Sequence, residues 1–341
     1  MQKTVKSQNI LLIVAALAFL SAGVFVSHLF NDTKPFQRSE YIMGTIFDIT
    51  SVGNSEKVFA DVAIKAFNEI KRIDDLMSRY KEGSEVSLIN KNAGIAPVKV
   101  GHELIEVLQE ARGISELSDG AFDVTIGPLT NLWGFDLEKN VVPPKEKIDE
   151  LKGLVNYRKL KIDEAASTVY LEEKGMMIDV GGIAKGYSLA RAMKVFEDAG
   201  IKDVIINAGG NLNLRGVKKR KPWRVGIQDP RDESKLIGTV TITDISVATS
   251  GDYQRYFIQD GVRYHHILDP KTGLPAKGLI SATVIGRGKT SMDGLSSAVF
   301  ILGADKGAAL MKRIGAEGIM LSEDGRMTIT EGLKEKFLRK P

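Results

Sequence analysis

The sequence predicts an α+β domain with a mainly antiparallel sheet core and flanking helices. The second half of the chain is rich in candidate strands, and short turns separate several of them, which favours antiparallel pairing. Segments with one apolar face at helical spacing stand before and after these strands. The candidate strands of the second half are 204–207, 223–228, 237–248, 253–259 and 279–285.

The first half of the chain predicts one strand followed by helices. Residues 41–52 are rich in β-branched and aromatic side chains, as strands are. Asn54 or Ser55 is a suitable cap for a helix that runs to about residue 78. The other expected elements are helices over 103–118, 141–148, 187–195 and 292–314, the last one kinked near Gly303, and a strand pair made by 161–170 and 176–179.

The N-terminus predicts a membrane anchor. Lys3 and Lys6 precede residues 10–26, an almost unbroken apolar stretch without a charge. We interpret it as an uncleaved signal-anchor helix, with a cleaved signal peptide as the alternative. The basic flank stays in the cytoplasm, so in a bacterium the rest of the chain lies on the periplasmic side of the inner membrane. The expected division is 1–30 anchor or signal peptide, 31–40 linker, and one folded domain over 41–341.

Composition excludes several function classes. The 341 residues include 47 basic and 43 acidic side chains, and the basic run at 218–221 is typical of a solvated hairpin tip, so no nucleic-acid partner is expected. The absence of cysteine excludes disulfides, thiolate metal sites, a cysteine nucleophile and a lipid-modified N-terminal cysteine. The chain has none of the motifs GxxxxGK[ST], HExxH or GxSxG, nor GxGxxG after a strand, that mark common hydrolases and dehydrogenases.

The stretch IDVGGIAKGYSLARA begins with an acid and a glycine-rich turn. Asp179, Gly182 and Lys185 follow a short apolar run and precede a predicted helix. A strand, a tight glycine turn and a helix start can present backbone N–H groups to an anion. The same pattern is also a common way for the chain to turn a corner, and the stretch alone leaves both interpretations open.

The stretch TSMDGLSS places a carboxylate and a hydroxyl on one helix face. Asp293 and Ser297 are four residues apart at the start of the last predicted helix. Such a pair suits a hard cation that also touches phosphate. Plain helix capping is the alternative, because Asp and Ser are common in a first turn.

The stretch HHILDPKTG contains a candidate general base. His266 precedes a turn that begins at Asp269-Pro270, and a histidine held beside a turn can accept a proton near neutral pH. The alternative is an ordinary histidine in a hairpin. His265 is the weaker candidate, because neighbours in a strand face opposite sides.

Taken in order, MGT, SRY, GAFDVTIGPL, DVGGIAKGY, NAGGNL, HILDPKTG and DGLSS resemble the ApbE family of FAD:protein FMN transferases, from residue 41 to the C-terminus. The resemblance implies an ApbE-like α+β fold and a periplasmic enzyme that uses FAD as substrate and Mg²⁺ as cofactor. It would transfer FMN through a phosphoester bond to a threonine (or serine) of an acceptor flavoprotein and release AMP. Subunits of membrane redox pumps and secreted reductases are the implied acceptors.

The resemblance also implies individual roles. His266 would sit beside the pyrophosphate as the base, and Asp293 would act in catalysis as well as in metal binding. Gly182, through its carbonyl, Asp293 and Ser297 would hold Mg²⁺. The residues that would contact FAD are Met43, Tyr80, Ala121, Phe122, Asp123, Asp179, Lys185, His266 and Ile267.

The chain departs from the family pattern at Ser297, where a threonine is usual. Serine keeps the oxygen, so metal binding is expected to survive. Two other functions remain open at this point. One is an FAD pyrophosphatase that gives FMN and AMP, and the other is a non-catalytic, membrane-tethered flavin-binding protein. The acid, hydroxyl and histidine argue against the last, since a carrier needs neither a metal nor a base.

Overall fold

The computed structural model describes residues 34–137, 139–287 and 291–339. The predicted anchor helix over residues 10–26 lies outside these residues. The described chain combines one large sheet, three small sheets and flanking helices, which confirms the predicted α+β class with antiparallel pairing.

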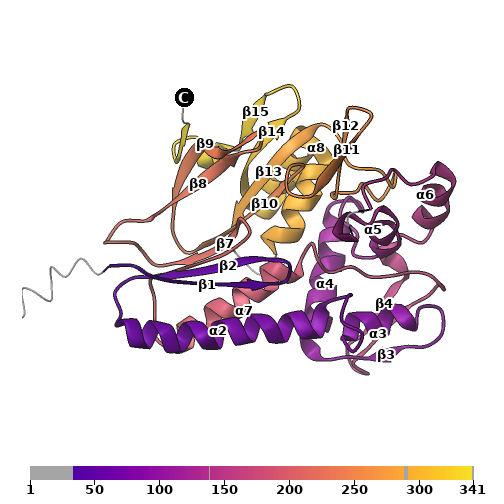
Figure 1. Ribbon diagram of the computed structural model, residues 1–341, viewed down its shortest axis with the longest axis horizontal. Coiled ribbons are helices and arrows are strands. Elements are labelled where there is room, and N and C mark those ends of the chain that lie inside the picture. Colours follow the sequence, from indigo (N-terminus) through magenta and orange to yellow (C-terminus); the bar gives the residue numbers. More distant parts are fainter. Residues whose placement is uncertain (1–33, 138, 288–290, 340–341) are drawn as a thin grey trace, which may run out of the picture.

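The large sheet has the strand order β1-β2-β6-β7-β10-β13-β14-β15, and all its neighbouring strands are antiparallel (Figure 1). Along its central strands, successive side chains enter two different cores, as in Val247 and Ala248 of β10. The strands are β1 (Phe36–Ile42), β2 (Thr45–Ser51), β6 (Val204–Ala208), β7 (Asn211–Arg215), β10 (Ile245–Gly251), β13 (Leu279–Gly286), β14 (Glu317–Ser322) and β15 (Met327–Ile329).

Helices cover one face of this sheet. The helix α2 (Glu56–Met77) repeats apolar residues at helical spacing, begins at a Ser55 side chain that accepts the Val58 amide, and packs with α7 (Ala184–Asp198) on β1, β2 and β6. The helix α8 (Met292–Ile314) covers β10, β13 and β14, and it kinks at Gly303 as predicted. Among the described helices, α8 alone is long and apolar enough to span a membrane, but half of that stretch is buried in this core.

The other face is covered by a three-stranded sheet of order β16-β9-β8. Its strands are β8 (Trp223–Asp229), β9 (Asp232–Ile242) and β16 (Phe337–Arg339). Because both faces of the large sheet are covered, all eight residues of β13 are buried. The basic run at 218–221 closes a tight turn before β8, as expected for a hairpin tip.

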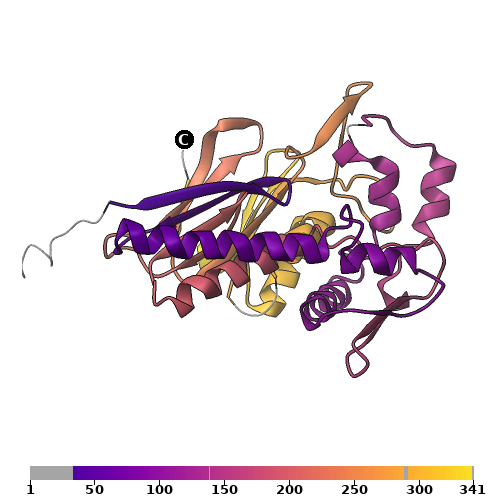
Figure 2. The same ribbon diagram turned by 60° about the horizontal axis from the view of Figure 1, so that its bottom comes forward.

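A group of smaller elements lies beyond the C-terminal end of α2 (Figures 1 and 2). The two-stranded sheet of β11 (Tyr256–Gln259) and β12 (Val262–His265) packs on an aromatic cluster with α5 and α6. The group's other members are α3 (Glu85–Lys91), α4 (His102–Leu117), α5 (Gly127–Trp133), α6 (Lys145–Lys152), β3 (Val98–Lys99), β4 (Leu160–Asp163) and β5 (Thr168–Leu171). Short 3₁₀ turns are η1 (Phe135–Leu137), η2 (Tyr157–Lys159) and, near the C-terminus, η3 (Glu331–Leu333).

Several predicted strands were wrong in extent. Residues 41–52 form the hairpin of β1 and β2 around Met43 and Gly44, and residues 36–40, expected in the linker, belong to β1 because Phe36 packs on Phe59. The segment 237–248 divides at Asp244 into β9 and β10, which lie in different sheets. The strand expected over 253–259 begins only at Tyr256.

The predicted pairing of 161–170 with 176–179 was also wrong. The pair lies within the first of these segments, where β4 and β5 form a hairpin. The Asp163 carboxylate accepts the Ala166 amide, and Ser167 adopts a left-handed conformation, so the chain reverses there. Residues 176–179 make only a single bridge, between Met177 and Ile126.

Candidate active site

The first turn of α8 meets the first turn of α7 at Asp293 and Gly186. The Asp293 side chain is 5% exposed, and its Oδ2 accepts the Gly186 amide at 3.3 Å. A Cβ on Gly186 would lie 2.5 Å from the Oγ of Ser291 and 3.1 Å from the Cβ of Asp293. Glycine at this position therefore lets the two helix starts touch.

Asn211 ties this junction to the large sheet. Its Nδ2 donates to Asp293 Oδ1 at 2.8 Å, and its Oδ1 accepts the Thr249 amide at 3.1 Å. Asn211 belongs to the motif NAGGNL, one of the stretches that resemble the family, and it had no predicted role of its own. Its contacts with Asp293 and Thr249 could not be predicted from the sequence, because these residues lie far along the chain. Only its place in the motif pointed to the site.

Hydroxyl groups line the next turn of α8. The Ser250 Oγ of β10 lies 3.1 Å from the Ser297 Oγ and 2.9 Å from the Ser296 Oγ. The Ser296 hydroxyl donates to the Asp293 carbonyl at 2.8 Å. The Ser297 hydroxyl therefore faces β10, and that it shares a metal ion with Asp293 stays a prediction.

The glycine-rich turn before α7 is held by Asp179. One carboxylate oxygen accepts the Gly181 amide at 2.9 Å, and the other accepts the Thr130 hydroxyl at 3.0 Å and pairs with Arg79 at 3.1 Å. Arg79 also stacks over the ring of Tyr80, which is 60% exposed. Asp179 and Tyr80, distant in sequence, thus share one cation.

The Lys185 ammonium group lies between a carbonyl oxygen and a carboxylate oxygen at this turn. Its Nζ donates to the Gly181 carbonyl at 3.0 Å and lies 3.6 Å from Asp293 Oδ2. Mg²⁺ also prefers carbonyl and carboxylate oxygens, so the chemistry of these groups is compatible with Mg²⁺, and its binding here stays a prediction. Among the described residues no cluster of three or more His, Cys, Asp or Glu side chains could hold a metal ion. A magnesium ion here would depend on one carboxylate, neutral oxygens and substrate phosphate, as is usual for Mg²⁺.

The Phe122 ring connects the glycine turn to α8. A Cβ on Gly182 would lie 3.1 Å from this ring, and one on Gly294 would lie 3.5 Å from it. Gly182 therefore lies near the first turn of α8. That its carbonyl binds the metal stays a prediction.

Asp123 is occupied within its own loop. Its Oδ1 accepts the amide and the hydroxyl of Thr125 at 2.8 and 2.7 Å, and its Oδ2 accepts the Tyr157 amide at 2.9 Å. Burial raises the pKa of Asp123, although these hydrogen bonds oppose the shift. The contacts fix the loop that carries the buried Ala121 and Phe122. A direct contact of Asp123 with FAD stays a prediction.

His266 has the protonation state that a general base requires. Its backbone amide and its Nδ1 both contact the Arg255 carbonyl, at 3.1 and 3.2 Å. A carbonyl only accepts, so Nδ1 carries the proton and Nε2 is the acceptor. Burial, followed by the charges of His265, Arg255 and Lys185, lowers the pKa of His266 to about 4, while part of the residue stays accessible. The ring is therefore neutral at pH 7.

His265 is unsuited to the same role. It is buried, its Nε2 contacts the Ala276 carbonyl at 2.9 Å, and its Nδ1 accepts the Ile267 amide at 3.3 Å. Both ring nitrogens are thus used inside the protein. Ile267 is buried next to it, and a contact of Ile267 with FAD stays a prediction.

The turn at Met43 and Gly44 lies near Arg255, the residue that contacts His266. A Cβ on Gly44 would be 3.2 Å from a guanidinium nitrogen of Arg255, whose carbonyl holds His266. Arg255 thus approaches both Gly44 and His266. That Met43 and His266 face one common site stays a prediction.

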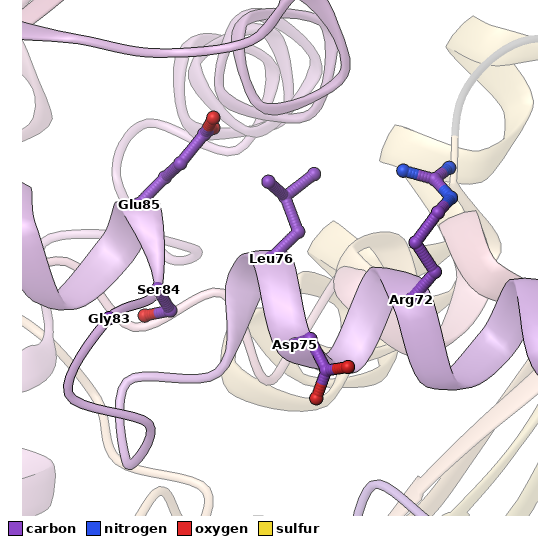
Figure 3. A pocket seen from close by; sticks show the side chains of 6 residues that line it. All are labelled: Arg72, Asp75, Leu76, Gly83, Ser84 and Glu85. Atoms are coloured by element: carbon purple, nitrogen blue, oxygen red, sulfur yellow. The ribbon is translucent and has the colours of Figure 1, made fainter.

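A separate cavity of about 350 Å³ lies between the end of α2 and the start of α3 (Figure 3). Arg72 pairs with Glu69 and Glu103. Glu85 Oε1 accepts the Gly101 amide, whereas Glu85 Oε2 is buried without a hydrogen-bond partner among the described residues. None of the predicted site residues lines it. The lining residues are Arg72, Asp75, Leu76, Gly83, Ser84 and Glu85.

Comparison with known proteins identifies the family. A family model described as the ApbE family matches residues 43–320. This chain belongs to the ApbE family. The predicted resemblance is thus confirmed over most of the described residues.

Individual ApbE relatives match nearly the whole chain. A Klebsiella pneumoniae protein named FAD:protein FMN transferase is 34% identical over 310 residues, which are 90% of this chain and 95% of that one. A Treponema pallidum protein of the same name is 29% identical over 321 residues, 89% of each chain.

Solved ApbE structures share the fold. The crystal structure of the ApbE protein from Thermotoga maritima has a TM-score of 0.83 and 35% identity, covering 90% of this chain and all of that one. The flavin transferase ApbE from Vibrio cholerae has a TM-score of 0.78 and 29% identity, covering 89% of this chain and 99% of that one.

Proposed function

We propose that this ApbE-family chain is an FAD:protein FMN transferase. It transfers FMN from FAD to a threonine (or serine) hydroxyl of an acceptor flavoprotein, requires Mg²⁺ and releases AMP. Family membership and the shared name of its relatives support the flavin-transfer activity. The observation that carries the finer proposal is the junction of α7 and α8, where Lys185 lies between the Gly181 carbonyl and the Asp293 carboxylate.

Asp293, Ser297 and the Gly182 carbonyl would hold the magnesium ion. A bound Mg²⁺ supplies positive charge that offsets the charge developing on the pyrophosphate. Asn211 and the Gly186 amide orient the Asp293 carboxylate through hydrogen bonds to its two oxygens. Lys185 adds a second positive charge on the same side, which favours a dinucleotide phosphate.

His266 is the proposed base. The acceptor hydroxyl gives its proton to Nε2 of the neutral ring while its oxygen bonds to the phosphorus of the FMN half. The bond from that phosphorus to the bridging oxygen breaks, and AMP leaves with the electron pair. A positioned base contributes about 10²–10⁴-fold to such a step.

The proposed FAD site lies around these groups. Met43 and Tyr80 are on accessible turns next to Arg255 and Arg79, respectively. Asp179 and Lys185 flank the glycine turn that precedes α7. The loop of Ala121, Phe122 and Asp123, together with Ile267, completes the set that we assign to FAD.

The proposed location is the periplasmic face of the inner membrane. It rests on Lys3, Lys6 and the apolar stretch 10–26, which together have the composition of an uncleaved signal anchor. Redox-pump subunits and secreted reductases are the proposed acceptors, since both are available on that side.

Mass spectrometry of an acceptor tests the proposal. The full-length protein in detergent is mixed with FAD, Mg²⁺ and a flavoprotein fragment that carries a candidate threonine. We expect the fragment to gain the mass of FMN less water, AMP to appear, and both to be lost in EDTA. AMP and free FMN with an unmodified fragment would favour the pyrophosphatase, and intact bound FAD would favour the carrier.

A charge-removing variant tests the metal site. We expect Asp293→Asn to lower AMP release by about 100-fold or more, because it keeps the shape but removes the charge. Asp305→Asn, on an exposed position of the same helix, is the matched control and should leave the rate unchanged. A wild-type rate in Asp293→Asn would contradict the proposed metal site.

A further inference from the structure

Glu110 holds the start of α8 from a neighbouring helix. It lies on α4, which packs against α8 (Figure 1). Its Oε1 accepts the backbone N–H of Ser291, the residue that precedes the first turn of α8. Sequence analysis gave Glu110 no role, because it belongs to none of the family motifs.

Ser291 does not cap α8 in the usual way. A serine at this position normally accepts an amide of the first turn through its hydroxyl. Here no side-chain cap is formed, and the Ser291 Oγ is buried without a hydrogen-bond partner among the described residues. The hydroxyl instead lies against Gly186, where a Cβ would come within 2.5 Å of it. The first turn of α8 is therefore held in part by the hydrogen bond from the Ser291 amide to Glu110.

The position of Asp293 depends on how the first turn of α8 is held against α7; we call this arrangement the seating of α8. Asp293 is two residues beyond Ser291, and its partners Gly186, Lys185 and Asn211 belong to α7 and β7. If the start of α8 moved away from α7, the carboxylate would lose these partners together. Glu110 contacts the backbone of Ser291, so it acts on the carboxylate through the helix.

We propose that Glu110 is a positioning residue that seats the first turn of α8 and thereby sets the affinity of Asp293 for the metal. The inference rests on the proposed function, because that function makes Asp293 a magnesium ligand. The feature that matters is an acceptor oxygen at the correct distance from the Ser291 amide. Groups of this kind, which orient a metal ligand without touching the metal, alter metal affinity or activity about 10–100-fold when removed.

Magnesium titrations of Glu110 variants test the inference. AMP release by the full-length protein is measured against Mg²⁺ and, separately, against FAD. Glu110→Ala removes the acceptor, and Glu110→Asp keeps the charge on a shorter side chain. We expect both to raise the Mg²⁺ concentration for half-maximal activity about tenfold or more, with a smaller change in the KM for FAD. Glu110→Gln, which keeps the oxygen, should restore nearly wild-type behaviour.

Glu116→Ala is the matched control, an exposed glutamate on the same helix, and should leave both titrations unchanged. Folded Glu110→Ala and Glu110→Asp variants with a wild-type Mg²⁺ response would overturn the inference. So would a Glu110→Gln variant as impaired as Glu110→Ala, because the acceptor oxygen would then not be the relevant feature.

Hydrogen exchange separates this inference from the proposed function. In the metal-free protein, amides 292–297 should exchange faster in Glu110→Ala than in the wild type or Glu110→Gln. This result would support the seating even if the wild type turned over no FAD, in which case only the proposed function would fail. Unchanged exchange of these amides would overturn the seating itself.

Discussion

The carboxylates of Asp123 and Asp179 differ in what surrounds them. Asp123 accepts neutral donors, namely the amide and hydroxyl of Thr125 and the amide of Tyr157, 34 residues along the chain. Asp179 also accepts neutral donors, from Gly181 and Thr130, but it pairs in addition with the charged Arg79. Both were predictable as acids in family motifs. Their partners were not, because the sequence does not say which donors lie within reach of an oxygen.

Asp123→Ala should destabilise the protein. The substitution leaves the amides of Thr125 and Tyr157 buried without an acceptor, so we expect the free energy of unfolding to fall by about 3 kcal/mol. Urea denaturation measures the change, and Asp305→Ala on an exposed position is the control. Wild-type stability of Asp123→Ala would mean that the carboxylate is not needed inside the loop.

Glu110 should make stability depend on pH. Burial raises the pKa of Glu110 from 4.5 to about 7, with the Ser291 amide opposing the shift and Glu106 adding to it. The unfolded chain releases this proton near the ordinary pKa, so rising pH favours unfolding. Glu110 makes its full contribution to the free energy of unfolding below pH 4.5. This contribution is at most about 3 kcal/mol, and it is lost as the pH rises through about 7.

Glu110→Gln isolates this contribution, because an amide does not titrate. Unfolding free energies measured between about pH 5 and about pH 8 should decline less steeply in the variant than in the wild type. Other buried acids titrate in both proteins and cancel in the difference. Two parallel curves would show that Glu110 is not the titrating group.

At the scale of elements, the long helices were predicted better than strand boundaries. The helix α2 repeats apolar residues at helical spacing, and the kink of α8 at Gly303 had a glycine as its signal. The shorter helices were predicted less well: the one expected over 141–148 begins only at Lys145, and α3 and α5 were not predicted. The strand errors occurred at Met43, Ser167 and Asp244, which adopt left-handed conformations without being glycine. Each reverses the chain inside a segment with strand-like composition. Residues other than glycine rarely adopt this conformation, so composition did not mark these turns, although Asp163 is a turn-forming residue that indicates the one at Ser167.

The junction of α7 and α8 predicts opposite effects for two glycine substitutions. Gly186→Ala places a methyl group against Ser291 and Asp293, so we expect a loss of about 1–3 kcal/mol and a weaker response to Mg²⁺. Gly113→Ala, in open space on α4, should stabilise the protein by about 0.4–1 kcal/mol. Thermal unfolding and AMP release are measured for both. Equal behaviour of the two variants would contradict the close approach of the helices.

At the scale of the whole molecule, the proposed site draws on segments that span most of the described chain. Met43 lies between the first two strands, Lys185 begins α7, His266 follows β12, and Asp293 begins α8. The order of the motifs was visible in the sequence and identified the family. Their convergence was not, because it depends on how the antiparallel sheet brings distant segments together.

A ligand that bridges these segments should stabilise the whole fold. FAD bound as proposed, between the glycine turn, the hairpin of Met43 and the start of α8, would have to dissociate before these elements separate. At an FAD concentration about 100 times its dissociation constant, the expected stabilisation is about 2.7 kcal/mol. Thermal unfolding without an acceptor should therefore show a higher Tm with FAD and Mg²⁺ than with FAD and EDTA. Asp293→Asn should lose the difference between Mg²⁺ and EDTA, whereas Asp305→Asn should keep it. If Mg²⁺ raised the Tm of Asp293→Asn as much as that of the wild type, the metal that helps FAD to bind would lie elsewhere in the protein.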